Sequence, residues 1–420
     1  MSQKIQSVKG MNDLLPGQIE VWHRVEGVLR NVAWRYGYQE IRTPVVEKME
    51  LFKQSIGDQT DIVEKEMYVF DDAGDVSLAL RPEATASTVR AGNQHGLFHN
   101  QQQRLWYMGP MFRREKPQKG RYRQFHQFGI EAFGWGDADI DAEVIRIGAR
   151  IWKELGVSEI SLQLNTLGSP AARVAYREAL YQYLSQNQDG LDDDSLKRLE
   201  KNPLRILDSK VASTQEIVKH APSILEFLEV ESRQHFDQLC ESLEQSGITP
   251  EVNSRLVRGL DYYTSTVFEW VTDKLGAQSA VCAGGRYDGL VEQRGGRPTP
   301  AVGFAMGVER LVELIAAEQL SHDRSFLDVY LVSMKGQQIA VELGEQLRDA
   351  GIRVCEHCGG GKIKNQMKKA DNSGARYAII IGEKEIEEDC VQLKDLRSNE
   401  GQQQIARTDL LSILSQRLSS

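Results

Sequence analysis

The segment RLWYMGPMFRREKPQKGRYRQFHQFGIEAF, residues 104–133, is the strongest indication of the fold in this sequence. Its two ends, 104–112 and 122–133, are rich in aromatic and alternating residues, which is typical of β-strands. The charged segment between them, 115–121, contains a proline and a glycine and therefore suits a hairpin connection. The sequence thus predicts a long antiparallel hairpin at the centre of a mixed, mainly antiparallel sheet.

Segments on either side of this hairpin predict the elements around it. Apolar residues recur at helical spacing over 19–32, and a second periodic run starts near Asp139 and stops at Gly156. Residues 38–46 have β-like composition, but Pro44 limits them to an irregular or edge strand. Helices packed beside an antiparallel sheet indicate an α+β domain.

The 420 residues suffice for two or three domains. We predict a first domain over residues 1–325, interrupted at about 168–250 by polar, leucine-containing sequence that indicates an inserted helical module. A polar linker is expected at 318–325. Over 326–420, short apolar strands alternate with helical stretches, which predicts a small α/β domain.

Charge and composition narrow the class of protein. The formal net charge of −9 argues against a protein that coats nucleic acid through its overall field, although basic clusters at 104–123 and 362–376 remain candidate sites for polyanions. No apolar run approaches the roughly 18 residues of a membrane span, and MSQKIQSVKG lacks the core of a signal peptide. Five scattered cysteines do not form a disulfide framework. We therefore expect a cytoplasmic protein without a membrane partner.

Arginines on the hairpin are the first candidates for chemistry. Arg113 lies where the first strand ends, and Arg121 and Arg123 lie at the return. Cations on rigid strands suit reactions that bring two anions together, such as a carboxylate and a phosphate. Phe125 is placed to stack on a purine, while packing within the sheet is an equally good interpretation.

The triplet Arg81-Pro82-Glu83 follows a predicted strand directly. Because Pro82 stiffens the turn, Glu83 is presented from a fixed frame and is a candidate for holding an ammonium group. An acid in the first turn of the next helix, favoured by the helix dipole, is the alternative interpretation.

Five separated motifs, in order, resemble the histidyl-tRNA synthetase family of class II aminoacyl-tRNA synthetases. LRPEATAS, FRREKPQKGRYRQFHQFGIEAFG and VGFAMGVERL resemble the class II signatures, and LVRGLDYYTSTVFEW and AGGRYDGL resemble two segments particular to this family. Together they are a strong signal, whereas each alone is weak. The resemblance implies that 1–325 is the catalytic domain and 326–420 an anticodon-binding domain.

The resemblance also implies a histidine site. Glu83 and Thr85 are expected to bind the amino group, and Arg258 is expected to stand opposite Arg113 as the second catalytic cation on the reacting phosphate. Other class II enzymes give that role to a metal or another side chain. The expected imidazole pocket consists of Gln127, Glu131, Tyr262, Tyr263 and Tyr287. Because a pocket of hydrogen-bonding groups rejects substrates that lack their own, no editing domain is expected, and the insertion resembles a clamp over the tRNA acceptor stem.

The implied co-substrate is ATP with Mg²⁺, with no tightly bound cofactor. Arg113 is expected on the α-phosphate, Arg121 and Arg310 on the outer phosphates and adenine, and Phe125 on the ring. No protein metal site is expected, because Cys355-Glu-His-Cys358 has no second ligand pair to complete a zinc site. Contacts to tRNA are expected from Gln118, Arg123, Lys362, Lys368 and Lys369.

These features together predict activation of L-histidine as its adenylate, release of pyrophosphate and transfer of histidine to the 3′ end of tRNA(His) by a homodimer that associates through 36–44. One alternative is a non-catalytic, synthetase-like regulatory subunit of histidine biosynthesis. Others are a synthetase for threonine, proline or glycine, which the two family-specific segments disfavour, and a structural RNA-binding protein, which would need no phosphate-gripping arginines.

Overall fold

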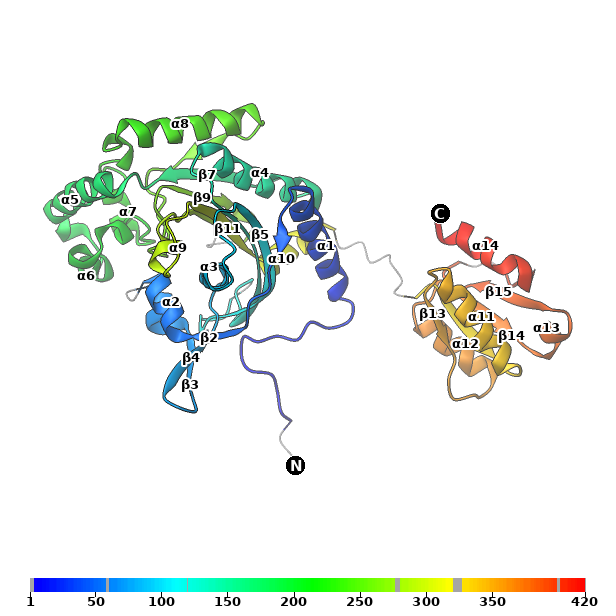
Figure 1. Cartoon of the computed structure of the whole chain (residues 1–420). Coiled ribbons are helices and arrows are strands. Elements are labelled where there is room, and N and C mark those ends of the chain that lie inside the picture. The colour runs from blue at the N-terminus through cyan, green and yellow to red at the C-terminus, as the bar shows by residue number, and fades with distance from the viewer. Residues whose placement is uncertain are drawn as a thin grey trace. The chain divides into compact units, whose positions relative to one another are not determined.

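The computed structural model describes residues 4–57, 60–118, 120–275, 280–319, 327–398 and 401–419. The chain forms two compact units, Met1–Leu320 and Ser321–Ser420 (Figure 1). Most of the linker predicted at 318–325, and the boundary at 325, lie outside the described residues.

The predicted hairpin is confirmed as the centre of the first unit. Strands β5 (Gln103–Phe112) and β6 (Gln124–Phe133) pair antiparallel along their whole length. They belong to an eight-stranded sheet in the order β1-β5-β6-β11-β10-β9-β7-β8. Only its edge pairs, β1 with β5 and β7 with β8, are parallel, so the mixed, mainly antiparallel sheet is confirmed. The other strands are β1 (Gln39–Glu40), β7 (Ser161–Thr166), β8 (Pro250–Val252), β9 (Thr266–Val271), β10 (Ala280–Arg286) and β11 (Ala301–Gly307).

Helices pack against this sheet through their apolar stripes. Helix α1 (Ile19–Arg35), predicted from its helical spacing, contacts α4 (Ala138–Leu155) and α10 (Val308–Gln319). Helix α4 ends at Gly156, whose φ of 76° suits a glycine. Helix α8 (Val230–Gln245) lies along α4 (Figure 1) and contributes Phe236, Leu239 and Leu243 to the same core.

The prediction of an irregular or edge strand at 38–46 is confirmed in part, because the two ends of this segment join the edges of two different sheets. Only Gln39 and Glu40 join the large sheet, and Val46 begins β2 of a three-stranded sheet. The chain leaves the ladder between them because Pro44 has no N–H, and the Thr43 carbonyl accepts a hydrogen bond from Arg81 Nη1 at 2.9 Å instead. This sheet has the order β2 (Val46–Lys48), β4 (Val76–Leu80), β3 (Tyr68–Asp72), and α2 (Met49–Ile56), the π-helix η1 (Ile62–Glu66) and α3 (Thr85–Gln94) flank it in sequence.

Between β7 and α8 the chain forms a group of short helices with a core of its own. Tyr176, Leu180 and Leu184 from α5 pack with Leu199, Ile206 and Val218 from the later turns. In Figure 1 these helices gather at one end of the unit, beside α8. They are α5 (Pro170–Gln186), η2 (Gln188–Gly190), α6 (Asp193–Lys201), η3 (Pro203–Ile206), α7 (Ala212–Val218) and η4 (Ile224–Glu226); η5 (Asp273–Leu275) and α9 (Leu290–Gln293) follow later in the chain.

The second unit is an α/β domain on a five-stranded sheet in the order β13-β12-β14-β15-β16. The three apolar strands that the sequence predicted here are confirmed and pair parallel. Alternating residues of β12 enter two cores, with Val329 and Leu331 in one and Tyr330 and Val332 in the other, so both faces are covered. The elements are β12 (Val329–Ser333), α11 (Gln337–Asp349), β13 (Val354–Glu356), α12 (Ile363–Asn372), β14 (Tyr377–Ile381), α13 (Glu383–Glu387), β15 (Cys390–Asp395), β16 (Gln403–Ala406) and α14 (Arg407–Ser419).

Across the described residues of both units, every helix is too short or too polar to cross a membrane.

Candidate active site

One cavity of about 870 Å³ in the first unit brings together the residues predicted for histidine and ATP. It is lined by the central hairpin, the start of α3, the loop 253–263 and the strands β9, β10 and β11. The predicted residues among its lining are Glu83, Thr85, Arg113, Arg121, Phe125, Gln127, Glu131, Arg258, Tyr262, Tyr263, Tyr287 and Arg310.

Glu131 of β6 lines the cavity and is only 1% exposed. Its Oε1 accepts a hydrogen bond from Thr85 Oγ1 at 2.7 Å, and its Oε2 accepts one from the Tyr287 hydroxyl. Gly303 pairs with Glu131 across the sheet, and a Cβ there would lie 1.9 Å from Oε2, so the site requires glycine. Burial raises the pKa of Glu131 to about 8, although the two hydroxyl donors oppose the shift.

This raised pKa makes the free energy of unfolding depend on pH. The folded state retains a proton on Glu131 that an unfolded chain loses near its ordinary pKa of about 4.3. The resulting stability is complete below that value and is lost as pH rises through about 8. Glutamine does not ionise, so we expect the Tm of Glu131→Gln to rise relative to that of the parent as the pH increases from about 5 to about 9. Thermal unfolding without ligand measures it; a constant difference would contradict the raised pKa, and the exposed Glu251→Gln should leave the difference flat.

The position of Glu83 is compatible with both interpretations that the sequence left open. Its carboxylate accepts hydrogen bonds from the backbone N–H of Thr85 at 2.7 Å and of Ala86 at 3.0 Å, so it holds the start of α3. The same buried carboxylate lines the cavity, and burial raises its pKa. A carboxylate fixed in this way is ready to accept an ammonium group.

The hairpin arginines share a carboxylate that the sequence analysis missed. Glu115 lies 3.8 Å from Arg113 Nη1 and 3.2 Å from Arg121 Nη1. The Arg113 guanidinium also lies 5.2 Å from the Phe125 ring centroid, and its Nε donates to the Pro82 carbonyl at 2.9 Å. The available signal was that Glu115 is the one acid in a strongly basic tip.

Arg258 enters the cavity from a different part of the chain. Its side chain is 18% exposed, forms an ion pair with Glu269 and lies with its guanidinium 5.7 Å from the Tyr263 ring centroid. Glu269 was also missed, and its signal was a carboxylate inside the apolar strand β9. Burial and the nearby charge of Arg121 lower the pKa of Arg310 to about 10. Crowded cations of this kind are suited to holding an anion.

Three tyrosines form an aromatic wall of the pocket. The ring centroids of Tyr262 and Tyr263 are 4.7 Å apart, and those of Tyr262 and Tyr287 are 5.6 Å apart. Behind them, the Tyr107 hydroxyl donates to Gln127 Oε1 at 3.4 Å, a contact that the sequence did not predict. The pocket therefore joins aromatic surface to hydroxyl, amide and carboxyl groups, a combination suited to a polar ring.

The residues predicted to contact tRNA do not line this cavity. Gln118 is exposed at the hairpin tip, and Arg123 Nε donates to the Glu115 carbonyl at 3.3 Å. Lys362, Lys368 and Lys369 are exposed in the second unit, at the start of α12 and along it. The cavity is also bordered by Leu207–Lys210 and by Gln215, Val218 and Lys219, which the sequence did not predict.

No cluster of three or more His, Cys, Asp or Glu side chains in the described ranges is arranged to hold a metal ion. The Sγ atoms of Cys355 and Cys358 each lie 3.7 Å from the Glu356 carbonyl oxygen.

The mainly antiparallel sheet, its basic hairpin and the separate α/β domain define a class II aminoacyl-tRNA synthetase. Residues 10–311 match the family model for histidyl-tRNA synthetase, and residues 328–417 match that for an anticodon binding domain. The chain belongs to the histidyl-tRNA synthetase family.

Solved structures agree with this assignment. The apo histidyl-tRNA synthetase of S. aureus is 35% identical, with a TM-score of 0.81 over 98% of this chain and 100% of that chain. The histidyl-tRNA synthetase of Nostoc sp. PCC 7120 shares the fold at 22% identity, with a TM-score of 0.72 over 99% and 100% of the two chains. An ATP phosphoribosyltransferase regulatory subunit/histidyl-tRNA synthetase from Bacillus halodurans also shares it at 23% identity, with a TM-score of 0.68 over 91% and 99%.

Proposed function

We propose that this protein activates L-histidine with ATP, forming histidyl-adenylate and pyrophosphate, and then transfers histidine to the 3′ end of tRNA(His). The observation that carries the proposal is that Arg113 and Arg258, from separate segments, line one cavity together with Glu131 and the tyrosine wall. Cations beside a polar aromatic pocket suit an anionic reaction centre attached to an imidazole.

In the proposed activation step, the histidine carboxylate attacks the α-phosphorus of ATP and the bond to pyrophosphate breaks. Arg113 and Arg258 stabilise the charge that gathers on the phosphorus oxygens. Arg121 and Arg310 hold the outer phosphates, which Mg²⁺ accompanies as part of the substrate, and Phe125 stacks on adenine.

The proposed histidine pocket fixes the other end of the substrate. Glu83 and Thr85 receive the ammonium group, which orients the carboxylate toward the arginines. Glu131, Gln127 and the tyrosines receive the imidazole ring, whose two nitrogens each require a partner. A substrate without those nitrogens would leave buried polar groups unpaired and would be rejected.

A non-catalytic regulatory subunit is the main alternative, because the name of one structural neighbour includes an ATP phosphoribosyltransferase regulatory subunit as well as a histidyl-tRNA synthetase. Arg113, Arg258, Glu83 and Arg310 all line the cavity here, and a subunit without catalysis would not need them. The second unit, which matches an anticodon binding domain, also favours the ligase.

Charging of tRNA(His) tests the proposal directly. Purified protein with ATP, Mg²⁺, labelled histidine and a tRNA(His) transcript is expected to yield acid-precipitable histidyl-tRNA. Failure of both charging and histidine-dependent ATP turnover would reject the ligase and favour the regulatory subunit.

We also propose that two copies associate through 36–44. Residues 39–40 form the edge strand β1 of the large sheet, so one side of this strand is open. Arg42 is exposed, with 76% of its side chain accessible. Sedimentation analysis is expected to give twice the mass of the chain, and a monomer at micromolar concentration would reject the association.

Lys368 and Lys369 are proposed to contact tRNA phosphates, because both are exposed on α12 of the second unit. Replacing both with alanine should weaken tRNA binding and flatten the plot of log K against log salt, by about 0.7–0.9 per lost contact. Filter binding over a salt series measures the slope. The exposed Lys384→Ala on α13 is the matched control, and an unchanged slope in the double variant would remove the two lysines from the RNA surface.

A further inference from the structure

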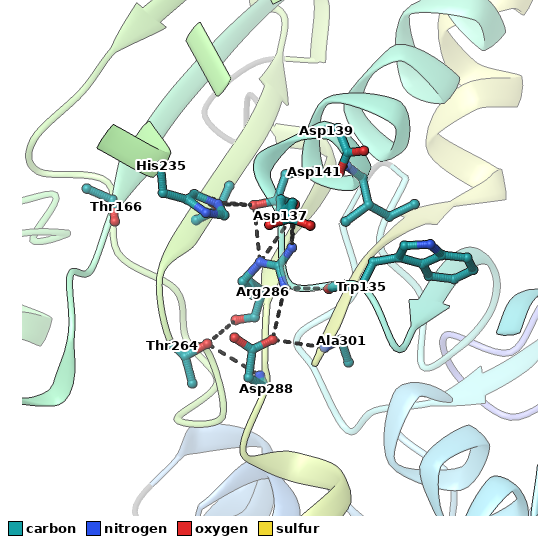
Figure 2. A network of polar contacts seen from close by, with 12 residues as sticks. Trp135, Asp137, Asp139, Asp141, Thr166, His235, Thr264, Arg286, Asp288 and Ala301 are labelled. Atoms are coloured by element: carbon teal, nitrogen blue, oxygen red, sulfur yellow. Dashed lines mark hydrogen bonds and ion pairs between the residues drawn. The ribbon is translucent and has the colours of Figure 1, made fainter. Parts of the chain in front are cut away.

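A buried polar network lies outside the lining of the cavity and is centred on Arg286, the last residue of β10 (Figure 2). The Arg286 side chain is 2% exposed, and its guanidinium donates to both oxygens of the Asp141 carboxylate on α4. It also donates to the Trp135 carbonyl at 2.9 Å, the Asp137 carbonyl at 3.1 Å and Asp288 Oδ1 at 3.1 Å. A guanidinium with this many partners fixes its own backbone segment firmly.

Asp141 is the matching hub on the helix and is completely buried. Its Oδ2 accepts from Thr266 Oγ1 at 2.7 Å and lies 2.9 Å from His235 Nε2. Burial alone would raise the pKa of Asp141, but the His235 hydrogen bond and the charge of Arg286 lower it below its ordinary value. The carboxylate is therefore charged, and a buried ion pair of this kind requires such additional partners.

The network continues by backbone contacts into the proposed histidine pocket. The Arg286 carbonyl accepts from Thr264 N at 2.8 Å, so it fixes the residue that follows Tyr263. On its other side, Tyr287 N donates to the Ala301 carbonyl at 2.8 Å, and the Tyr287 hydroxyl donates to Glu131. Arg286 thus holds the two chain segments that carry the tyrosines.

The helical insertion reaches the same network from two directions. His235 lies on α8, in the last part of the insertion predicted at 168–250, and its side chain is 24% exposed. Arg173 of α5, within the insertion, donates to the Thr264 carbonyl. A displacement of either helix would therefore be transmitted to the turn that follows Tyr263.

We propose that Asp141 and Arg286 are positioning residues for histidine recognition, and that His235 couples helix α8 to the histidine pocket through them. This inference rests on the proposed function. None of the three side chains lines the cavity, so each acts through the tyrosines and Glu131. Loosening the network should impair histidine binding and leave ATP binding intact, because Arg113, Arg121 and Phe125 belong to the hairpin.

The test is histidine-dependent pyrophosphate exchange by Arg286→Lys, His235→Ala and His235→Gln. Arg286→Lys keeps the positive charge but loses the planar guanidinium and its multiple hydrogen-bond donors. We expect its histidine KM to rise about 10- to 100-fold while its ATP KM stays within about twofold of that of the parent. The His235 side chain is partly exposed, and His235→Ala leaves the Arg286–Asp141 pair in place. This variant therefore tests the proposal even if Arg286→Lys does not fold. The histidine KM of His235→Ala should rise about 3- to 10-fold. His235→Gln retains a hydrogen-bond donor, so its histidine KM should stay close to that of the parent.

A purely structural role gives a different result. If the network only stabilised the fold, the variants would contain a smaller fraction of active protein, measured by active-site titration. The KM for histidine and the KM for ATP would both stay unchanged. Glu143→Gln is the matched control, because Glu143 also lies on α4 and pairs with Arg104 but does not join the network. Its histidine KM should equal that of the parent.

Two failures can be separated. If the parent protein shows no histidine-dependent exchange, the proposed function fails and the inference falls with it. If the parent is active and both His235→Ala and Arg286→Lys keep its histidine KM, or if the KM for ATP rises equally, the positioning role alone is overturned.

Discussion

Arg258→Ala is expected to lower the kcat of histidine-dependent pyrophosphate exchange by about 10² to 10³, the usual cost of losing one group that stabilises transition-state charge. Arg258 lines the cavity from the loop 253–263, whereas Arg113 enters from the hairpin. Removing one cation leaves the charge on the reacting phosphate only partly stabilised. The effect should fall mainly on kcat, because the interaction strengthens as negative charge develops.

The Glu269 carboxylate, which forms an ion pair with Arg258, loses that partner in this variant, so its folding should be checked by circular dichroism. Arg255→Ala is a matched control, because Arg255 lines the same cavity but its side chain is exposed and is given no catalytic role. Exchange by Arg258→Ala close to that of the Arg255 variant would contradict the proposed cation.

Glu131→Ala should raise the histidine KM by about 10- to 100-fold, since a buried hydrogen-bonding group lost from the pocket costs about 1–3 kcal/mol. The ATP KM should change far less, because Glu131 is hydrogen-bonded to Thr85 and Tyr287, whereas ATP is proposed to contact Arg113, Arg121, Phe125 and Arg310. Initial-rate exchange with each substrate varied in turn measures both constants.

Two side chains complicate this variant and suggest its control. Thr85 and Tyr287 both donate to Glu131, so their hydroxyls lose an acceptor. Glu131→Gln keeps the shape and one oxygen acceptor and should show a smaller rise in the histidine KM. Equal increases in the KM for histidine and for ATP would show that Glu131 supports the whole cavity and is not specific to imidazole.

The elements predicted correctly from the sequence are those with a strong local pattern of apolar residues. The hairpin of β5 and β6 and the helix α1 followed from alternation and helical spacing, because both elements bury one face of their own. Strand β10 was not predicted, because Ala280–Arg286 holds two adjacent glycines and little apolar bulk. The sheet requires such residues, since a Cβ on Gly284 would lie 2.2 Å from the Gly303 carbonyl oxygen.

The residues of the candidate site also fall into those that the sequence predicted and those that it did not. Residues within family motifs could be predicted because each motif is contiguous. Glu115 and Glu269 gain their meaning from arginines that they meet in space, and Lys210 and Lys219 border the cavity only because the insertion folds over it. The sequence marks Glu115 and Glu269 as unusual acids in their segments, but it does not show which arginines they meet.

Arg113 and Arg258 lie in the same cavity as the proposed imidazole pocket, which predicts that histidine is the amino acid activated. Pyrophosphate exchange into ATP, run separately with each of the standard amino acids, tests this prediction. Exchange with histidine alone is the predicted result, with every other amino acid near background. Equal exchange with a second amino acid, or no exchange with histidine under conditions where the protein is folded, would contradict it.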